Sequence, residues 1–346
     1  MTLPHLTQAR APLTSEIDAV NEFGEVQRVS IPAERALTIY VDKRELVTLM
    51  TLGANPELLV LGYLRNQRLV TSVEDIESIT VDWAVGAAAV KTRDGIDDIE
   101  EKTANRVVTT GCGQGSVFGG LMDEVDQIEL PANACITQSQ LYGLVNAIRL
   151  KETTYKSAGS VHACALFSTA SGESEMLLFV EDVGRHNAID TIAGWMWCVT
   201  PTLATACAAR GLAGRGLRDA SPLSPVQSCA GRTGAAGSSP EGAPAPADRQ
   251  SRICGPELHA APALDASVVS AAAGLVFYTT GRLTSEMVIK SAQMGVPIVV
   301  SRSGITQMGH QVAQVVGLCA IGRATNKRFL CYTHAERLKL QAGQLS

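Results

Sequence analysis

The sequence predicts an α/β fold in which helices cover a layered mixed sheet. Apolar runs of strand length recur along the chain, and in the second half each run ends in polar residues and leads into a helical pattern. Strands that alternate with helices are typical of sheets with helices packed on their faces. The run 176–180 is apolar throughout, which predicts a central strand buried on both faces.

The first half of the chain supplies strands and a clear helix start. Residues 1–30 are polar and mixed, so we expect a partly ordered lead-in. Asn55, Pro56 and Glu57 predict a helix start, because asparagine caps a helix, proline suits its first turn and a carboxylate favours its positive end. Apolar runs predict strands at 37–41, 44–50, 76–81 and 85–90.

The later elements repeat the order strand, polar tip and helix. Leu141, Leu144, Val145 and Ile148 recur at i, i+3, i+4 and i+7, which predicts an amphipathic helix. A polar turn is expected at 154–159. Strands are predicted at 161–167, at 176–180, within 274–282, within 295–303, at 318–323 and at 329–332, and helices at 188–198, from 285 and around 312–316.

Residues 200–264 differ in composition from everything around them. More than half of residues 201–250 are alanine, glycine, serine or proline, and no aromatic residue occurs between Trp197 and Phe277. Such a segment buries too little apolar surface to offset its chain entropy, so we expect a disordered insertion. The insertion divides the folded part of the chain into residues 31–199 and 265–346, which we expect to form its α/β domain or domains.

A glycine-rich stretch at 109–118 places Cys112 between Gly111 and Gly113, after a strand-like run at 106–108. Glycines let the backbone bend and let large partners come close, so this thiol is expected on a mobile loop at a strand end. Such a position suits a nucleophile or a sulfur carrier. The alternative is a tight turn whose cysteine is incidental, since free cysteines are usually small buried hydrophobes.

Composition excludes several classes of protein. The chain has 346 residues, 46% of them hydrophobic and 18% charged, and a formal charge of −5. This balance gives no electrostatic case for nucleic acid, and no apolar run is long enough to span a membrane. The N-terminus does not resemble a secretory signal. Nine cysteines without a Cys-x-x-Cys pair argue against a disulfide framework and a four-cysteine zinc site, so a reducing cytoplasm is expected.

Arginines recur where apolar strands end. They are Arg185, Arg282, Arg302, Arg323 and Arg328. If these strand tips lie along one edge of the sheet, their guanidinium groups form a pocket for phosphates, because the guanidinium fork matches phosphate oxygens. The alternative is a set of unrelated surface arginines.

The segment 181–190 gathers polar side chains directly after the strand 176–180. Glu181, Asp182, His186 and Asp190 could bind metal or do acid–base chemistry. The alternative is helix capping with a salt bridge to Arg185, which we favour for Glu181 and Asp190. His186 is the more plausible functional residue, because we expect it on the loop.

Two known motifs are incomplete in this chain. His162 and Cys164 match part of a zinc deaminase pattern, which also needs a glutamate two residues after the histidine and a Pro-Cys-x-x-Cys segment. Alternation places both residues on one face of a strand, and we interpret them as sheet residues. No Gly-Lys-Ser/Thr follows the glycines of 111–115, so a phosphate-binding P-loop is excluded and no metal site is expected.

Several blocks together resemble the formate dehydrogenase accessory sulfurtransferase family. The blocks are Thr-Gly-Cys-Gly at 110–113, Val-Glu-Asp-Val-Gly-Arg-His-Asn-Ala-Ile-Asp at 180–190, Thr-Gly-Arg-Leu-Thr-Ser-Glu-Met at 280–287, Val-Val-Ser-Arg-Ser at 299–303 and Cys-Tyr-Thr-His at 331–334. The resemblance covers roughly residues 20–200 and 266–346, and the Glu-Asp-Val-Gly-Arg-His-Asn segment is its most specific part.

This resemblance implies a cytoplasmic homodimer with a cytidine-deaminase-like core that lacks zinc. Such a protein takes sulfur from a cysteine desulfurase as a persulfide and passes it to the bis-molybdopterin guanine dinucleotide molybdenum cofactor, before that cofactor enters formate dehydrogenase. Cys112 matches the persulfide cysteine. The cofactor-contacting stretch falls on Arg323, Ala324, Thr325, Asn326, Lys327 and Arg328, and Arg185, His186 and Arg282 are further candidates for cofactor contacts.

The chain departs from the family in two places. Many members have Cys-x-x-Cys in the loop, whereas Gly115 fills the second place here, and the insertion at 200–264 interrupts two family blocks. One thiol suffices for a persulfide, but a resolving partner is lost. Two other hypotheses therefore stay open: a non-catalytic chaperone that only binds and delivers the cofactor, and a degenerate nucleoside deaminase, which the missing ligands disfavour.

Overall fold

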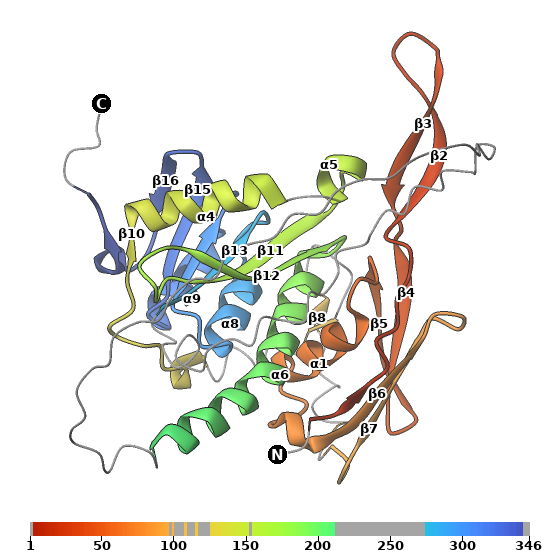
Figure 1. The fold of residues 1–346 in the computed structure, drawn as a ribbon, viewed down its shortest axis with the longest axis horizontal. Coiled ribbons are helices and arrows are strands. Elements are labelled where there is room, and N and C mark those ends of the chain that lie inside the picture. Colours follow the sequence, from red (N-terminus) through yellow and green to blue (C-terminus); the bar gives the residue numbers. More distant parts are fainter. Residues whose placement is uncertain are drawn as a thin grey trace, which may run out of the picture.

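Two main β-sheets organise the chain in the computed structural model, which describes residues 3–96, 125–151, 154–211 and 274–341, residue 99 and the short strands 107–108 and 115–116. One sheet lies in the N-terminal part of the chain and the other in the remainder (Figure 1). Their strand orders are β1-β6-β7-β4-β5 and β12-β11-β13-β14-β15-β16. The predicted α/β class is confirmed, whereas the likeness to cytidine deaminases stays a prediction.

The N-terminal sheet buries one face against a helix. Its strands are β1 (His5–Leu6), β4 (Arg35–Val41), β5 (Arg44–Thr51), β6 (Ile76–Asp82) and β7 (Ala87–Thr92). In β4, Leu37, Ile39 and Val41 are buried at every second position, as strand geometry requires of an apolar face. Helix α1 (Pro56–Asn66) packs there, beginning at Pro56 as predicted, and the 3-10 helix η1 (Val73–Asp75) precedes β6.

The second sheet combines parallel and antiparallel strands. Its members are β11 (His162–Ser168), β12 (Glu175–Asp182), β13 (Leu275–Thr279), β14 (Ile298–Ser301), β15 (Cys319–Thr325) and β16 (Arg328–Cys331). Strands β13, β14 and β15 are parallel, while β11 is antiparallel to both of its neighbours and β16 is antiparallel to β15. The mixed sheet predicted from the sequence is therefore present.

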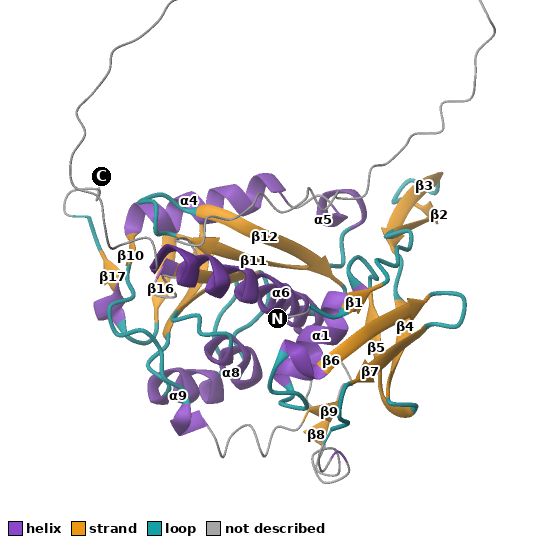
Figure 2. Ribbon diagram, turned by 60° about the horizontal axis from the view of Figure 1, so that its bottom comes forward, coloured by secondary structure: helices purple, strands orange, loops and turns teal. Residues whose placement is uncertain are grey.

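Helices cover both faces of this second sheet (Figure 2). Helix α4 (Gln138–Lys151) buries Leu141, Leu144 and Ile148 against one face, which agrees with the predicted amphipathic spacing. Helices α6 (Arg185–Gly211), α8 (Ser285–Gln293) and α9 (Gln307–Val315) cover the other face. The strands are apolar on both sides because each side packs against helices.

A close crossing of α1 and α6 joins the two sheet units. A Cβ atom on Gly62 would lie 1.6 Å from the carbonyl oxygen of Asp190, and one on Gly194 would lie 2.0 Å from that of Leu58. Only glycine, which has no Cβ, allows the two backbones to approach this closely. The crossing therefore fixes the N-terminal sheet relative to the second one.

The prediction that residues 176–180 form a central strand is wrong, because β12 is at the edge of its sheet. Its side chains nevertheless face apolar surroundings on both sides. Met176 and Phe179 pack beside the α4 layer, whereas Leu178 and Val180 pack beside the α6 layer. An edge strand between two helical layers thus has the same apolar sequence as a central strand.

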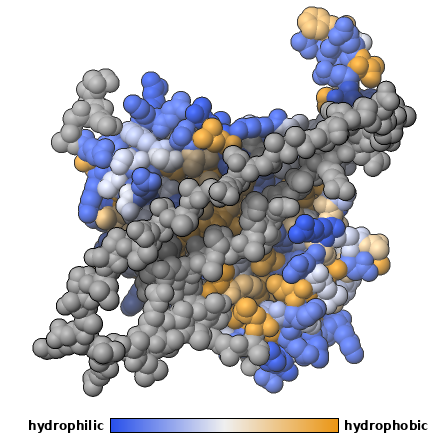
Figure 3. Space-filling view, in the orientation of Figure 1, coloured by the Kyte–Doolittle hydropathy of each residue, from blue (hydrophilic) through white to orange (hydrophobic). Residues whose placement is uncertain are grey.

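The N-terminal segment is more regular than the predicted lead-in. Strands β2 (Thr14–Val20) and β3 (Val26–Pro32) form an antiparallel hairpin that projects from the body of the molecule (Figure 1). Apolar side chains gather near its tip (Figure 3), where Val20, Phe23 and Val26 are each at least 68% exposed. The sequence did not predict these two strands, because neither has a buried face that would produce an alternating apolar pattern.

The shorter elements complete the described chain. They are β8 (Val107–Val108), β9 (Gly115–Ser116), η2 (Val125–Gln127), β10 (Ile136–Thr137), α5 (Thr154–Ala158), η4 (Ala335–Arg337) and β17 (Leu338–Lys339). Helix α5 replaces the predicted polar turn, and α6 continues to residue 211, past the predicted start of the insertion. The remaining insertion lies outside the described residues. Within the described residues, no helix is both long and apolar enough to cross a membrane.

Candidate functional site

The polar tips of the second sheet meet at one of its edges. Strands β12, β13 and β14 end there and β11 begins there, because β11 is antiparallel to β12 and β13. Arg185, Arg282 and Arg302 follow the three strand ends. The Arg302 amide donates a hydrogen bond to the Thr279 carbonyl at 3.0 Å, which ties the β14 tip to the β13 tip.

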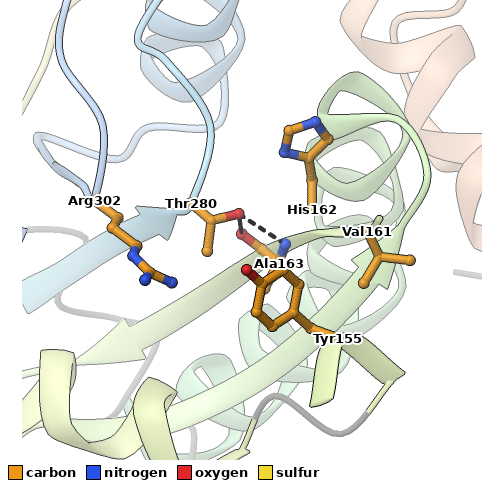
Figure 4. Close-up of a pocket in the computed structure, with 6 residues that line it drawn as sticks. All are labelled: Tyr155, Val161, His162, Ala163, Thr280 and Arg302. Carbon is orange, nitrogen blue, oxygen red and sulfur yellow. Dashed lines mark hydrogen bonds between the residues drawn. The ribbon is translucent and has the colours of Figure 1, made fainter. Parts of the chain in front are cut away.

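A first pocket of about 250 Å³ opens at this edge (Figure 4). Its lining residues are Tyr155, Val161, His162, Ala163, Thr280 and Arg302. The hydroxyl of Thr280 accepts a hydrogen bond from the Ala163 amide at 3.0 Å, which joins β11 to the end of β13. The pocket therefore presents an imidazole, a guanidinium and hydroxyl groups from segments far apart in sequence.

Charge around this pocket favours an anion. Burial lowers the pKa of His162, and the nearby Arg185 and Arg282 lower it further. The imidazole is thus neutral at pH 7, so the positive charge at this pocket comes from arginine and not from histidine. Arg185 packs on Gly281, where a Cβ atom would lie 2.8 Å from Arg185 Cδ, so the glycine makes room for this arginine.

A second pocket of about 680 Å³ lies beside the β15–β16 hairpin. Its lining residues are Gln138, Tyr142, Arg323, Thr325, Lys327, Arg328, Phe329, Leu330, Leu340 and Gln341. Three of these are cationic and none is acidic, so the pocket is suited to phosphate groups. The rings of Tyr142 and Phe329, with centroids 6.2 Å apart, give it a partly aromatic wall.

Irregular backbone shapes the hairpin at this pocket. The pairing register of β15 and β16 shifts between Gly322 and Thr325, and Arg323 has a φ of 51°. A bulge of this kind re-aims side chains, and left-handed backbone suits the asparagine at 326, whose φ is 50°. The Tyr142 hydroxyl donates a hydrogen bond to the Lys327 carbonyl at 3.1 Å, which holds the hairpin turn against α4.

The carboxylates after β12 have structural partners. Glu181 accepts hydrogen bonds from the backbone amides of Thr154 and Tyr155 at 2.8 and 3.1 Å, and so positions Tyr155 at the first pocket. Asp182 accepts hydrogen bonds from the Thr51 hydroxyl and the Gly184 amide, among others. Burial raises the pKa of Asp182, although these hydrogen bonds oppose the shift. Glu181 therefore binds the first amides of α5, and not those of the helix that follows it in the sequence.

His186 and Asp190 lie in the core instead of at the pockets. The sequence predicts His186 on a loop, but it is the second residue of α6, and its Nδ1 lies 3.4 Å from Glu286 Oε1. Burial lowers its pKa to about 3. Asp190 pairs with Lys290 at 2.9 Å, so the expected salt bridge to Arg185 is replaced by one to α8. Neither His186 nor Asp190 lines either pocket.

Two short strands flank the predicted reactive thiol in the sequence. Strands β8 and β9 pair antiparallel, with Val108 opposite Gly115, so the segment holding Cys112 connects two paired strands. Cys112 itself lies outside the described residues. Cys164 is fully buried, and burial raises its pKa to about 12, which leaves it unreactive at neutral pH. The described part of the chain contains no group of three or more residues able to hold a metal ion.

The strand-end arginines therefore divide between two pockets instead of forming one. Arg302 lines the first pocket, and Arg185 and Arg282 lower the pKa of His162, which also lines it. Arg323 and Arg328 line the second pocket. Tyr142 and Tyr155 were not predicted as site residues. Tyr142 lies on α4, far in sequence from the β15–β16 residues that line the second pocket, and Tyr155 lies on α5, which was predicted as a polar turn. For Tyr155 the available signal was a tyrosine between the polar residues Thr154 and Lys156.

Comparisons with known proteins agree on one family. A sequence model of the FdhD/NarQ family matches residues 32–209 and 266–339. The sulfur carrier protein FdhD of Bacillus subtilis (strain 168) is 26% identical over 326 residues, which cover 92% of this chain and 94% of that protein. That of Listeria monocytogenes serotype 4b is 24% identical, over 92% of this chain and 95% of its own length.

A solved structure shows the same fold. It is the crystal structure of a Desulfotalea psychrophila protein described as a formate dehydrogenase accessory protein, which superimposes with a TM-score of 0.57 at 18% identity. The match covers 94% of this chain and all of that chain.

Proposed function

The chain belongs to the FdhD/NarQ family, and we propose from this membership that it is a sulfur carrier required for formate dehydrogenase activity. The observation that supports the proposal most strongly is the second pocket. The stretch 323–328, which the family resemblance assigns to cofactor contact, contributes Arg323, Thr325, Lys327 and Arg328 to its lining. Sequence resemblance and geometry thus point to one place on the protein.

Sulfur would arrive as a persulfide from a cysteine desulfurase. The Cys112 thiolate attacks the outer sulfur of the donor persulfide, a new sulfur–sulfur bond forms at Cys112, and the donor leaves as a cysteine thiolate. The step consumes no external oxidant, because the outer sulfur is already at the persulfide oxidation level. Glycines stand at 111, 113 and 115 around Cys112 in the sequence, and residues without a Cβ let a large partner approach a thiol closely.

The acceptor we propose is the molybdenum of the bis-molybdopterin guanine dinucleotide cofactor, bound as a passing substrate. Arg323, Lys327 and Arg328 would contact its phosphates, and the Tyr142–Phe329 wall offers a surface on which a planar base can stack. Thr325 adds a hydroxyl to the pocket. Ala324 is buried, so its contribution is to hold the bulge, and Asn326 supplies the hairpin turn.

The first pocket would take a further anionic part of the same cofactor. Arg302 lines it directly, and Arg185 and Arg282 supply positive charge beside His162. His186 is buried against Glu286, so its role in cofactor binding would be indirect, through the placement of α6. We further propose that the protein works in the cytoplasm as a homodimer, with a desulfurase and formate dehydrogenase as successive partners.

An alternative proposal is a non-catalytic chaperone that binds and delivers the cofactor without transferring sulfur. It uses the same two pockets but does not need the thiol. Replacement of Cys112 by alanine separates the two proposals, since only a carrier loses its activity.

The test is the intact mass of the protein after incubation with a cysteine desulfurase and cysteine. We expect the mass to rise by one sulfur atom, to return to its original value on reduction, and to stay constant in Cys112→Ala. Cys198→Ala, which removes a half-buried thiol of α6, serves as the matched control and should still gain sulfur. Sulfur gain in Cys112→Ala, or full formate dehydrogenase maturation by that variant, would overturn the carrier proposal.

A further inference from the structure

Two thiols are in contact at the base of the β15–β16 hairpin. Cys319 begins β15, Cys331 ends β16, and their Sγ atoms are 3.8 Å apart. Cys319 is fully buried, whereas Cys331 is half-buried. The two neighbouring thiols therefore differ in solvent exposure: Cys331 is partly accessible to solvent, and Cys319 is not.

The backbone around the pair is firmly held. The Tyr332 amide donates to the Ala320 carbonyl at 2.8 Å, and the Thr333 hydroxyl donates to the Leu318 carbonyl at 2.6 Å. The same hydroxyl accepts a hydrogen bond from the Ala320 amide at 3.0 Å. These hydrogen bonds hold the two strand ends together, so the backbone itself keeps the two thiols close to each other.

The contact also makes the two thiols chemically different. A hydrogen bond from the Cys319 thiol lowers the pKa of Cys331, because it stabilises the Cys331 thiolate. The same bond, together with burial, raises the pKa of Cys319. Cys331 is thus suited to attack first. Cys319 is placed to attack next by its 3.8 Å distance, because a bond formed at the Cys331 sulfur removes the thiolate whose hydrogen bond raises the pKa of Cys319.

We propose that Cys319 and Cys331 are a redox-active thiol pair that closes to a reversible disulfide by exchange with a low-molecular-weight disulfide. The Cys331 thiolate attacks one sulfur of the small disulfide, forms a mixed disulfide and releases one thiolate. The sulfur of Cys319 then attacks the Cys331 sulfur, its proton passes to solvent, and the second thiolate leaves. Both cysteines are oxidised, and the small disulfide is reduced to two thiols.

The pair lies next to the second pocket. Phe329 is two residues before Cys331 on β16, so both face the α4 side of the sheet, and Arg328, Phe329 and Leu330 line the pocket. A disulfide would link the first residue of β15 to the last residue of β16, at the base of the hairpin that lines this pocket. The proposal uses neither Cys112 nor its persulfide, so it stands apart from the sulfur-carrier function.

The test oxidises the native full-length protein with glutathione disulfide, blocks the remaining thiols with N-ethylmaleimide and digests it with trypsin without reduction. Cleavage after Arg302, Arg323, Arg328 and Arg337 places the cysteines in peptides 303–323 and 329–337. We expect these two peptides as one linked species, lighter than their sum by two hydrogen atoms. Dithiothreitol should separate them again.

Two variants define the order of attack. Cys319→Ala should stop at the mixed disulfide, with glutathione retained on Cys331, whereas Cys331→Ala should leave Cys319 without glutathione. Cys164 provides a control within the same protein, because this buried thiol should stay unlinked throughout. If both cysteines carry N-ethylmaleimide after oxidation, or if the wild-type protein keeps glutathione on Cys331, the proposed pair is refuted.

Discussion

The Nζ atom of Lys290 lies 2.9 Å from Oδ2 of Asp190, and at most 1% of either side chain is exposed. Asn66 of α1 donates a hydrogen bond to the other oxygen of Asp190 at 2.7 Å, and Glu286 lies 3.4 Å from the same ammonium. Burial lowers the pKa of Lys290, but the two carboxylates outweigh this effect and raise it. Helices α1, α6 and α8 therefore meet at a buried charged cluster.

Replacement of Lys290 by methionine should destabilise the fold by about 3–5 kcal/mol, because Asp190 would be left as an unpaired buried charge. Urea unfolding measures this loss. Lys91→Met is the matched control, since the Lys91–Glu77 pair is exposed and should contribute about 1 kcal/mol or less. A similar loss of stability in both variants would show that the buried Lys290–Asp190 pair matters no more to the fold than an exposed ion pair.

His186 should make the fold less stable in acid. Burial lowers its pKa from 6.5 to about 3, although Glu286 opposes the shift. Its contribution is thus complete above pH 6.5 and is lost as the pH falls through 3, because the unfolded chain binds the proton first. The stability difference between wild type and His186→Asn should fall towards low pH, by at most about 1.4 kcal/mol per pH unit.

Asp190 should show the opposite dependence on pH. Burial raises its pKa from 3.8 to about 6, despite the opposing effect of Lys290. Its contribution is present below pH 3.8 and is lost as the pH rises through 6. Urea unfolding of wild type and Asp190→Asn across this range measures the slope. A slope of the same sign as that of His186→Asn would refute the assignment.

Replacement of Gly62 by alanine should disrupt the crossing of α1 and α6. The new Cβ would lie 1.6 Å from a backbone oxygen that cannot move without moving α6, so we expect a loss of about 3 kcal/mol or more. Gly143→Ala on α4 is the control, because its nearest atom is 4.0 Å away, and alanine there should stabilise the helix by about 0.5–1 kcal/mol. Thermal unfolding compares the two, and equal effects would contradict the close-packing argument.

Replacement of Arg328 by alanine should weaken binding of guanosine diphosphate, used as a probe for one arm of the proposed cofactor. A lost hydrogen bond to a charged group is worth about 1.5–3 kcal/mol, so the dissociation constant should rise at least about tenfold. Calorimetric titration measures it. Arg149→Ala, which removes an exposed arginine of α4 outside both pockets, should bind like wild type. Equal loss in the two variants would indicate only a general effect of charge.

Much of the secondary structure was predictable because its signals are local. The spacing of Leu141, Leu144 and Ile148 specifies the buried face of α4, and Pro56 marks the first turn of α1. The strand-end arginines were equally visible, because each follows an apolar run. Their division between two pockets was not predictable, since it depends on the strand order of the sheet.

Two predictions from local sequence patterns were wrong or incomplete, because those patterns do not show what surrounds a segment in the folded protein. The apolar sequence of β12 reflects the helices packed on both of its faces. It does not reveal that β11 is the one strand paired with β12 among the described residues. The β2–β3 hairpin has little buried surface, so its sequence carries little periodicity. In both cases the pattern reports side-chain burial, whereas strand order is set by backbone pairing.

By itself, the sequence determined the α/β class, the family and the candidate thiol at Cys112, because these depend on motifs and local periodicity. Only the tertiary structure decided that His186 is a core residue, that Lys290 neutralises Asp190, and that two cysteines of one hairpin are in contact. Those relationships join residues far apart or on different strands, and distance in space is what fixes their charge and reactivity.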